Sequence, residues 1–394
     1  MKIELKDKFE SLIIIKQYLD DIDFTFIVKY LHEEYLYSDV FENFTEVNSK
    51  LQFLNPRYAF YLSLFMLGHK CSETNIKKYL PEYVFDALTE TGIVIKNGLS
   101  WQMPSLCIIP LSGLYFVNYL PSTYPTASSK IGSKGFDNEQ IQFLNSFNFT
   151  TKKEEIIELF SNCGLLGIYS ARNGSIVKIH TNCSENEMII RFNIGLNQVS
   201  DKVEVLNLAI ENIASKFENN FDCVLSMPQN TKKTIYSEKL SFIIEDENLS
   251  KVFFFLNNLL KEDGYAKIFL KSFGNQHVIN MNDTIIKHVT GNIDFKVIKK
   301  ETSYEYIQKI ITGSMTDWEK KAGVVTTELN KKIEALQKVI INLDDPCDFV
   351  YSQIVRIQNS KTSQNILSPL YNPIYTDSLF VKAFTNKYNN VEDI

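Results

Sequence analysis

The chain has 394 residues, of which 44% are hydrophobic, so it can form two or three domains with a sizeable core. Its formal net charge of -6 at pH 7 argues against a general nucleic-acid or membrane-surface partner. Six scattered cysteines form no Cys-x-x-Cys pair, and the chain has neither a signal-type start nor an apolar run of about 18 residues. The composition therefore predicts a cytoplasmic protein with free thiols.

Residues 1–104 have the pattern of a helical domain. Apolar faces predict helices over 9–19, 24–35 and 57–67, the last directly after Pro56, where proline starts helices well. A short helix to Leu80 and another over 81–90 follow. Two short apolar runs, 93–95 and 99–103, flank a Lys-Asn-Gly turn and predict a hairpin. Helices followed by a hairpin suggest a winged-helix-like module.

Many winged-helix modules bind DNA, but the candidate recognition helix here has the wrong charge. Residues 81–90 include three acidic side chains and neither lysine nor arginine. Phosphate contacts need basic groups. We therefore expect the module to pack on the rest of the protein and not to bind nucleic acid.

Residues 105–305 have the pattern of an α/β domain. Strands are expected at 106–109 and 114–119, then a polar loop over 121–134 and a helix to Phe147 that Asp137 caps. From Ile156 to Asn230 short apolar runs alternate with helical periodicity. Strands are predicted over 156–160, 175–180, 203–206 and 221–226, and helices over 165–174, 184–196 and 209–217. This alternation predicts a parallel sheet with a ligand crevice at the carboxyl ends of its strands.

Three runs within this stretch carry a family resemblance. They are the run from Glu158 to Asn173, the run Arg191-Phe192-Asn193-Ile194-Gly195-Leu196-Asn197, and the run from Val199 to Glu204. Together they resemble the cofactor-binding half of class I S-adenosylmethionine-dependent methyltransferases, and are most similar to the release-factor and ribosomal enzymes. The resemblance implies a Rossmann-like sheet, S-adenosylmethionine as cofactor and a winged-helix-like domain covering the substrate side.

The resemblance also implies which residues would contact the cofactor. The Asp-Leu-Gly-x-Gly-x-Gly loop of the family matches a run in which Glu158 replaces the acid, Phe160 and Asn162 replace two glycines, and Gly164 remains. Thr181 stands for the acid that holds the ribose, and Ala209 for the acid near adenine. The Asn-Pro-Pro-Tyr loop becomes Met227-Pro228-Gln229-Asn230. The candidate cofactor-binding residues are Glu158, Phe160, Asn162, Gly164, His180, Thr181, Ala209, Met227 and Pro228. The histidines show no metal-ligand spacing, so no metal is expected and no catalytic residue is assigned.

These replacements have a calculable effect. A hydrogen bond to a charged group contributes roughly 1.5 to 3 kcal/mol, so losing both carboxylates weakens cofactor binding by about a hundredfold to ten-thousandfold. We therefore favour a methyltransferase fold with a decayed cofactor site, serving as a non-catalytic or repurposed subunit that supports a partner protein. The alternative is an active methyltransferase for a small molecule, peptide or protein, with the cofactor held by Glu158, Gly164, His180 and backbone groups.

The remainder of the chain completes the domain and adds an extension. A helix over 249–260, a turn at 261–264, a strand over 265–270, a helix over 283–288 and a strand over 295–299 are expected. Residues 306–394 form a predicted C-terminal extension with a long helix over 317–343, a strand over 349–357 and a polar loop over 359–376. The apolar face of the long helix either packs on its own domain or forms a dimer surface.

Overall fold

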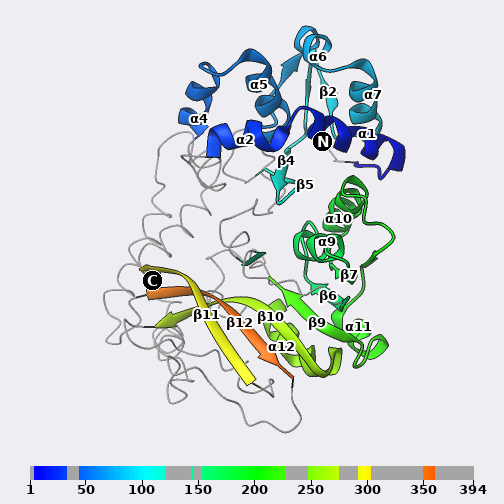
Figure 1. The fold of residues 1–394 in the computed structure, drawn as a ribbon, viewed down its shortest axis with the longest axis vertical. Helices are drawn as coiled ribbons and strands as arrows, with labels where there is room; N and C mark the ends of the chain where they lie inside the picture. The colour runs from blue at the N-terminus through cyan, green and yellow to red at the C-terminus, as the bar shows by residue number, and fades with distance from the viewer. Residues whose placement is uncertain are drawn as a thin grey trace, which may run out of the picture. The chain divides into compact units, whose positions relative to one another are not determined.

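The computed structural model describes residues 4–32, 44–120, 143–144, 153–227, 247–274, 292–302 and 349–359. The chain divides into two compact units, one made of Met1–Lys153 and Ser161–Asn207, the other of Glu154–Phe160 and Leu208–Ile394. Figure 1 labels the elements in chain order. Several predicted features lie outside the described residues: the loop over 121–134, Asp137, the helices over 283–288 and 317–343, and the loop after residue 359.

The first unit begins with helices that bury one apolar side. They are α1 (Phe9–Asp21), α2 (Phe24–His32), α4 (Phe44–Leu51) and α5 (Pro56–Tyr61), followed by the π-helical segment η1 (Leu62–Met66). In α1, Leu12, Ile15 and Leu19 are buried at helical spacing. Asn55 caps α5 by accepting a hydrogen bond from the Arg57 amide. The predicted helix over 57–67 is therefore an α-helix that continues as a π-helical segment.

A small antiparallel sheet follows. Its strands β1 (Cys71–Ser72), β2 (Ile95–Asn97) and β3 (Ser100–Gln102) have the order β1-β3-β2, and the helices α6 (Glu73–Tyr79) and α7 (Glu82–Glu90) lie between β1 and β2 in sequence. Ser72 caps α6 by accepting from the Asn75 amide at 3.2 Å. The predicted hairpin is confirmed as β2 and β3, while the winged-helix assignment stays a prediction.

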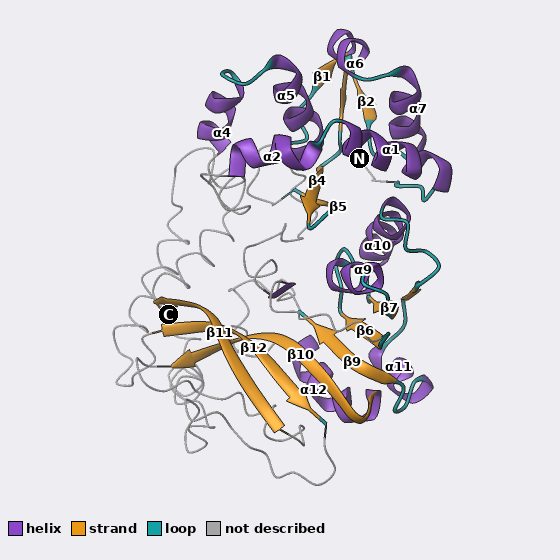
Figure 2. Ribbon diagram, viewed as in Figure 1, coloured by secondary structure: helices purple, strands orange, loops and turns teal. Residues whose placement is uncertain are grey.

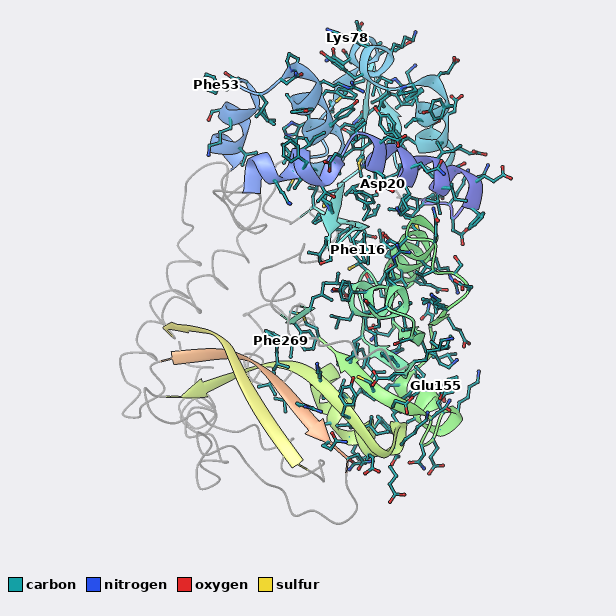
Figure 3. The ribbon with its side chains drawn as sticks, in the orientation of Figure 1. Asp20, Phe53, Lys78, Phe116, Glu155 and Phe269 are labelled. Carbon is teal, nitrogen blue, oxygen red and sulfur yellow. The ribbon has the colours of Figure 1, made fainter. Side chains whose placement is uncertain are left out.

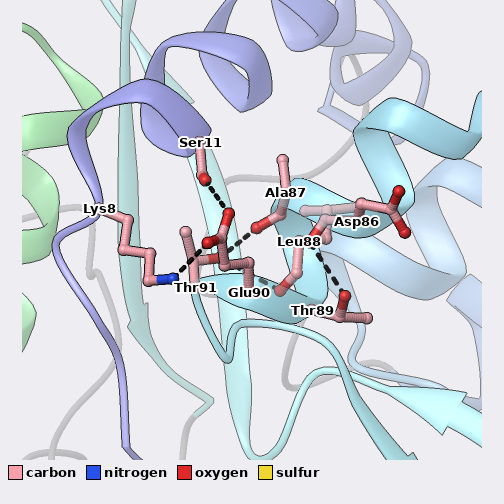
Figure 4. A network of polar contacts seen from close by, with 8 residues as sticks. All are labelled: Lys8, Ser11, Asp86, Ala87, Leu88, Thr89, Glu90 and Thr91. Carbon is pink, nitrogen blue, oxygen red and sulfur yellow. Dashed lines mark hydrogen bonds and ion pairs between the residues drawn. The ribbon is translucent and has the colours of Figure 1, made fainter.

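An extended N-terminal segment fastens α1 to the end of α7 (Figure 4). The Glu90 carboxylate pairs with Lys8 and accepts a hydrogen bond of 2.6 Å from the Ser11 hydroxyl. The Lys6 amide donates to the Thr91 carbonyl at 3.0 Å. Because Lys8 donates to it, the pKa of Glu90 is lowered. These contacts hold the start of α1 against the end of α7.

The remainder of the first unit contains a hairpin and a β-α-β arrangement. The hairpin strands β4 (Leu106–Leu111) and β5 (Leu114–Tyr119) are buried throughout. After them come α9 (Leu165–Arg172), β7 (Ile176–His180), α10 (Ser184–Leu196) and β8 (Val203–Leu206). Strands β7 and β8 pair in parallel from Val177 with Val203 to His180 with Leu206.

In the part of the second unit that the structure describes there are five strands and two helices, which Figure 2 shows by colour. The strands are β6 (Glu155–Leu159), β9 (Phe221–Ser226), β10 (Leu260–Gly274), β11 (Asn292–Thr302) and β12 (Phe349–Gln358), and the helices are α11 (Ile210–Lys216) and α12 (Glu247–Leu259). Parallel pairing joins β6 to β9 and β9 to β10, whereas β12 pairs antiparallel with both β10 and β11. The sheet is therefore mixed.

An ionic cluster joins the amino ends of three of these strands. Glu155, labelled in Figure 3, starts β6. The ammonium of Lys261 lies 3.0 Å from the Glu155 carboxylate and 3.2 Å from that of Asp222. The Glu155 amide also donates to Asp222 at 2.8 Å. The cluster is at the opposite ends of the strands from the crevice that a parallel sheet offers to ligands.

Among the residues that the structure describes, the large sheet has seven strands in the order β11-β12-β10-β9-β6-β7-β8. From β6 the order runs outward in both directions, as in doubly wound folds, so the reversal point lies between β6 and β9. The predicted α/β class is confirmed. Within the ranges described, no helix is long and apolar enough to span a bilayer.

Two predictions about the end of the sheet need correction. The strand expected at 349–357 in a separate extension lies in the sheet between β10 and β11, where Ile354, Val355 and Ile357 are buried. The turn expected at 261–264 is an irregularity within β10, because Asp263 has φ of 67° and the register with β9 shifts between Leu260 and Tyr265. Both errors arise from pairing between segments far apart in sequence.

Candidate functional site

The candidate site begins at the loop between β6 and α9, where two residues have the left-handed backbone conformation that glycine adopts most easily. Phe160 has φ of 56° and Gly164 has φ of 79°. For a bulky side chain such a φ is an outlier that costs roughly 1 to 2 kcal/mol. The resemblance has glycine where this chain has Phe160. The loop therefore has, at Phe160, a backbone conformation that glycine adopts far more easily than phenylalanine.

Phe160 also fills space, because its side chain is only 7% exposed. It follows the carboxyl end of β6, beside the reversal point of the strand order. At the same end the Ser226 hydroxyl of β9 donates to the Leu159 carbonyl at 3.2 Å. Glu158, the remaining acid of the motif, is 5% exposed and lies opposite Leu225 in the register. This part of the second unit is therefore packed with an aromatic ring and an internal hydrogen bond.

The end of β7 in the first unit is equally enclosed. His180 is 0% exposed and Thr181 is 1% exposed. The His180 carbonyl accepts from the Ser161 amide at 2.9 Å, and the Thr181 amide donates to the Leu206 carbonyl at 3.0 Å. The Thr181 hydroxyl accepts a longer bond of 3.4 Å from the Cys183 amide. Here the strand ends in a buried neutral hydroxyl, where the resemblance has a carboxylate for the ribose.

The other candidate residues differ in exposure. Ala209 is exposed and directly precedes α11. Met227 follows β9 and is half-buried, while Pro228 lies outside the described residues. Asn162 is half-buried, and its side-chain carbonyl accepts from the Asn186 amide group at 3.1 Å. Within the ranges described, no cluster of acidic, histidine or cysteine side chains could hold a metal ion.

Two polar residues that the sequence analysis did not assign lie beside this edge of the first unit. Asn207 directly follows β8, and its side-chain amide donates to Glu187 on α10 at 2.7 Å. Glu187 also pairs with Arg191 at 2.8 Å. The hydrogen bond from Asn207, which has the largest effect, and the one from Arg191 both lower the pKa of Glu187. The signal for Asn207 was its position after the third core strand, where parallel sheets present ligand-contacting side chains.

Two buried asparagines, Asn193 in α10 and Asn197 directly after it, hold the β4–β5 hairpin. The Asn193 side chain accepts from the Val117 amide at 2.7 Å and donates to the Val117 carbonyl at 2.9 Å. Asn197 does the same with Tyr115, at 2.9 Å and 2.7 Å. Four residues of helix rise about 6 Å and two residues of strand about 7 Å, so the two amides match the edge of β5. The resemblance pointed to Asn193, whereas Asn197 was not assigned a role.

Gly164 gives a direct test of how closely the loop packs. Replacing it with alanine is expected to lower the free energy of unfolding by roughly 2 to 3 kcal/mol, since φ is positive and the added Cβ would meet Ile168 at 3.0 Å and Ile179 and Ile190 at 3.3 Å. The control is Gly113→Ala, where φ is 77° and nothing lies within 4 Å, so that the backbone strain is matched and only the packing differs. Chemical denaturation should show a smaller loss for the control. Equal losses would mean that packing around Gly164 is unimportant.

The comparison with protein families agrees with this fold. A family model described as lysine methyltransferase matches residues 126–240, which is under a third of the chain. This range includes β6 to β9 and the loop from Phe160 to Gly164. The match supports a class I S-adenosylmethionine-dependent methyltransferase fold, and the finer likeness to release-factor enzymes stays a prediction. No curated protein matched the chain.

Solved structures that resemble the chain do so at low identity. A phosphoethanolamine N-methyltransferase from Haemonchus contortus, solved with S-adenosylhomocysteine, is 12% identical with a TM-score of 0.35, over 58% of this chain and 54% of that one. The match thus spans about half of that enzyme. A methyltransferase from Agrobacterium tumefaciens is 12% identical with a TM-score of 0.38, over 69% and 79%. A transferase from Pyrococcus horikoshii is 10% identical with a TM-score of 0.35, over 73% and 86%.

Proposed function

We propose that this chain is a methyltransferase-fold protein whose S-adenosylmethionine site has decayed, and that it serves as a non-catalytic or repurposed subunit supporting a partner protein. The observation that carries the proposal is Phe160. A buried phenylalanine occupies a left-handed backbone position where the resemblance has glycine. In the family, that position lets the backbone approach the methionine part of the cofactor.

Internal hydrogen bonding supports the same proposal. In the first unit the Ser161 hydroxyl accepts from the Gly164 amide at 2.9 Å, and Asn162 accepts from Asn186. Glu187, which supplies a carboxylate near the end of β8, already accepts from Asn207 and Arg191. A ligand would have to replace these bonds, which contribute roughly 1 kcal/mol each and more where charge is involved.

Calorimetric titration of the full chain with S-adenosylmethionine tests the decayed site. We expect no saturable heat up to about 1 mM cofactor, because the two carboxylates of the family are missing. S-adenosylhomocysteine should behave in the same way. Micromolar binding of either molecule would refute the proposal and favour the alternative of an active methyltransferase.

The partner half of the proposal needs a separate measurement. If the chain supports another protein, it should elute from its native host as a complex of defined stoichiometry larger than the monomer. Sedimentation velocity on tagged material from that host would measure this. Recovery of the monomer alone would remove the support for a subunit role, whatever the titration showed.

A further inference from the structure

Asn193 contacts two structures at once. Besides its two bonds to Val117 in β5, its side-chain amide donates to the Cys163 carbonyl at 2.9 Å. Cys163 lies in the loop between β6 and α9. All of these residues belong to the first compact unit. A single buried amide group therefore joins the hairpin and the loop at the candidate site.

The geometry leaves Asn193 with no spare hydrogen. A primary amide has two donor hydrogens, and here one goes to each carbonyl. Asn193 and Val117 are fully buried, and Cys163 is 3% exposed. A hydrogen bond lost at a buried carbonyl is not readily replaced by water, so the loss is costly. Opening either the hairpin or the loop therefore disturbs the Asn193 side-chain amide, which also bonds to the other of the two.

We propose that Asn193 couples the β4–β5 hairpin to the loop Ser161–Gly164, so that loosening the hairpin loosens the loop. The N-terminal part of the chain then controls the backbone at the candidate site through this one side chain. A partner protein that binds and stabilises the hairpin would order the loop, and one that displaces the hairpin would make the loop less ordered. This inference does not depend on whether the site binds S-adenosylmethionine.

Asn197 provides a matched variant. It follows the last residue of α10 and is almost equally buried. It holds the same hairpin strand through the same two kinds of bond to Tyr115. Among the bonds described, none of those made by the Asn197 side chain reaches the loop. Replacing Asn197 therefore weakens the hairpin without touching the loop directly.

Three buried cysteines report on the opening of each part. Cys163 lies in the loop, Cys107 in β4 of the hairpin, and Cys223 in β9 of the second unit. The experiment is labelling of the folded full chain with a maleimide, followed by mass spectrometry of each cysteine. It compares the wild type, Asn197→Leu, Asn193→Leu and the double variant. Leucine keeps the side-chain size and removes the hydrogen bonds.

We expect Asn197→Leu to accelerate labelling of Cys107 and, through Asn193, of Cys163 by at least about fivefold. In the Asn193→Leu background Cys163 should already label fast, and adding Asn197→Leu should accelerate Cys107 alone. The milder pair Asn197→Ser and Asn193→Ser serves if the leucine variants do not fold. Coupling through Asn193 is rejected if Asn197→Leu leaves Cys163 unchanged or accelerates it equally in both backgrounds. It is also rejected if Cys223 accelerates along with Cys163, because the opening is then global.

Discussion

Exchanging Thr181 and Ala209 for aspartate, together with Phe160→Gly, is expected to raise the affinity for S-adenosylmethionine by about a hundredfold to ten-thousandfold. Each carboxylate restores hydrogen bonds that contribute roughly 1.5 to 3 kcal/mol. Glycine at position 160 removes the buried ring and accepts the left-handed conformation without strain. Calorimetric titration of the triple variant should show saturable binding well below about 1 mM S-adenosylmethionine, where none is expected for the wild type, and this gives a lower limit for the gain.

The matched control replaces the same positions with asparagine, again with Phe160→Gly. Asparagine is nearly the same size as aspartate but carries no charge, so its gain should be much smaller. Thr181 is buried, and a carboxylate there destabilises the protein when no ligand is bound. Circular dichroism must therefore first establish that both variants fold. If the folded variant with two aspartates and Phe160→Gly bound no better than the wild type, the decay would involve more than these side chains.

The largest loss of stability is expected for Asn193→Ala. The change removes three buried hydrogen bonds, one to the Val117 amide, one to the Val117 carbonyl and one to the Cys163 carbonyl. At roughly 1 to 3 kcal/mol for each buried group that loses this bond, with partial relaxation, the free energy of unfolding should fall by about 3 to 5 kcal/mol. Urea denaturation followed by circular dichroism measures the change.

Asn186→Ala is the control for that measurement. Asn186 lies on the same helix but is half-buried, and its side chain donates one bond of 3.1 Å to Asn162. Its loss should cost under about 1 kcal/mol because water can replace the bond. If the free energy of unfolding fell equally in the two variants, the contacts of Asn193 would stabilise the fold no more than the Asn186–Asn162 bond does.

The sequence predicted the regular part of the sheet well. The helix over 184–196 and the strands over 203–206 and 221–226 have the predicted bounds. These elements carry strong local signals, namely short apolar runs for strands and helical periodicity between them. The parallel pairing of β7 with β8 and of β6 with β9 follows from the same alternation.

Features that depend on distant contacts could not be predicted. The strand predicted over 349–357 is confirmed as β12, which ends one residue later, but nothing local shows that it inserts between β10 and β11. The hairpin role of Asn197 depends on the edge of β5, which is 82 residues away in the chain. For the candidate site, the resemblance located the loop and the strand ends, whereas the positive φ of Phe160 and the burial of Thr181 appeared only in the structure.

The place of β12 in the sheet has a consequence for synthesis of the chain on the ribosome. The strand between β10 and β11 is contributed by residues 349–358, so both neighbours are translated well before it. Until β12 emerges from the ribosome, β10 and β11 each have an exposed edge with no neighbouring strand, and such edges promote aggregation. Folding of the nascent protein should therefore remain incomplete until β12 has left the ribosome.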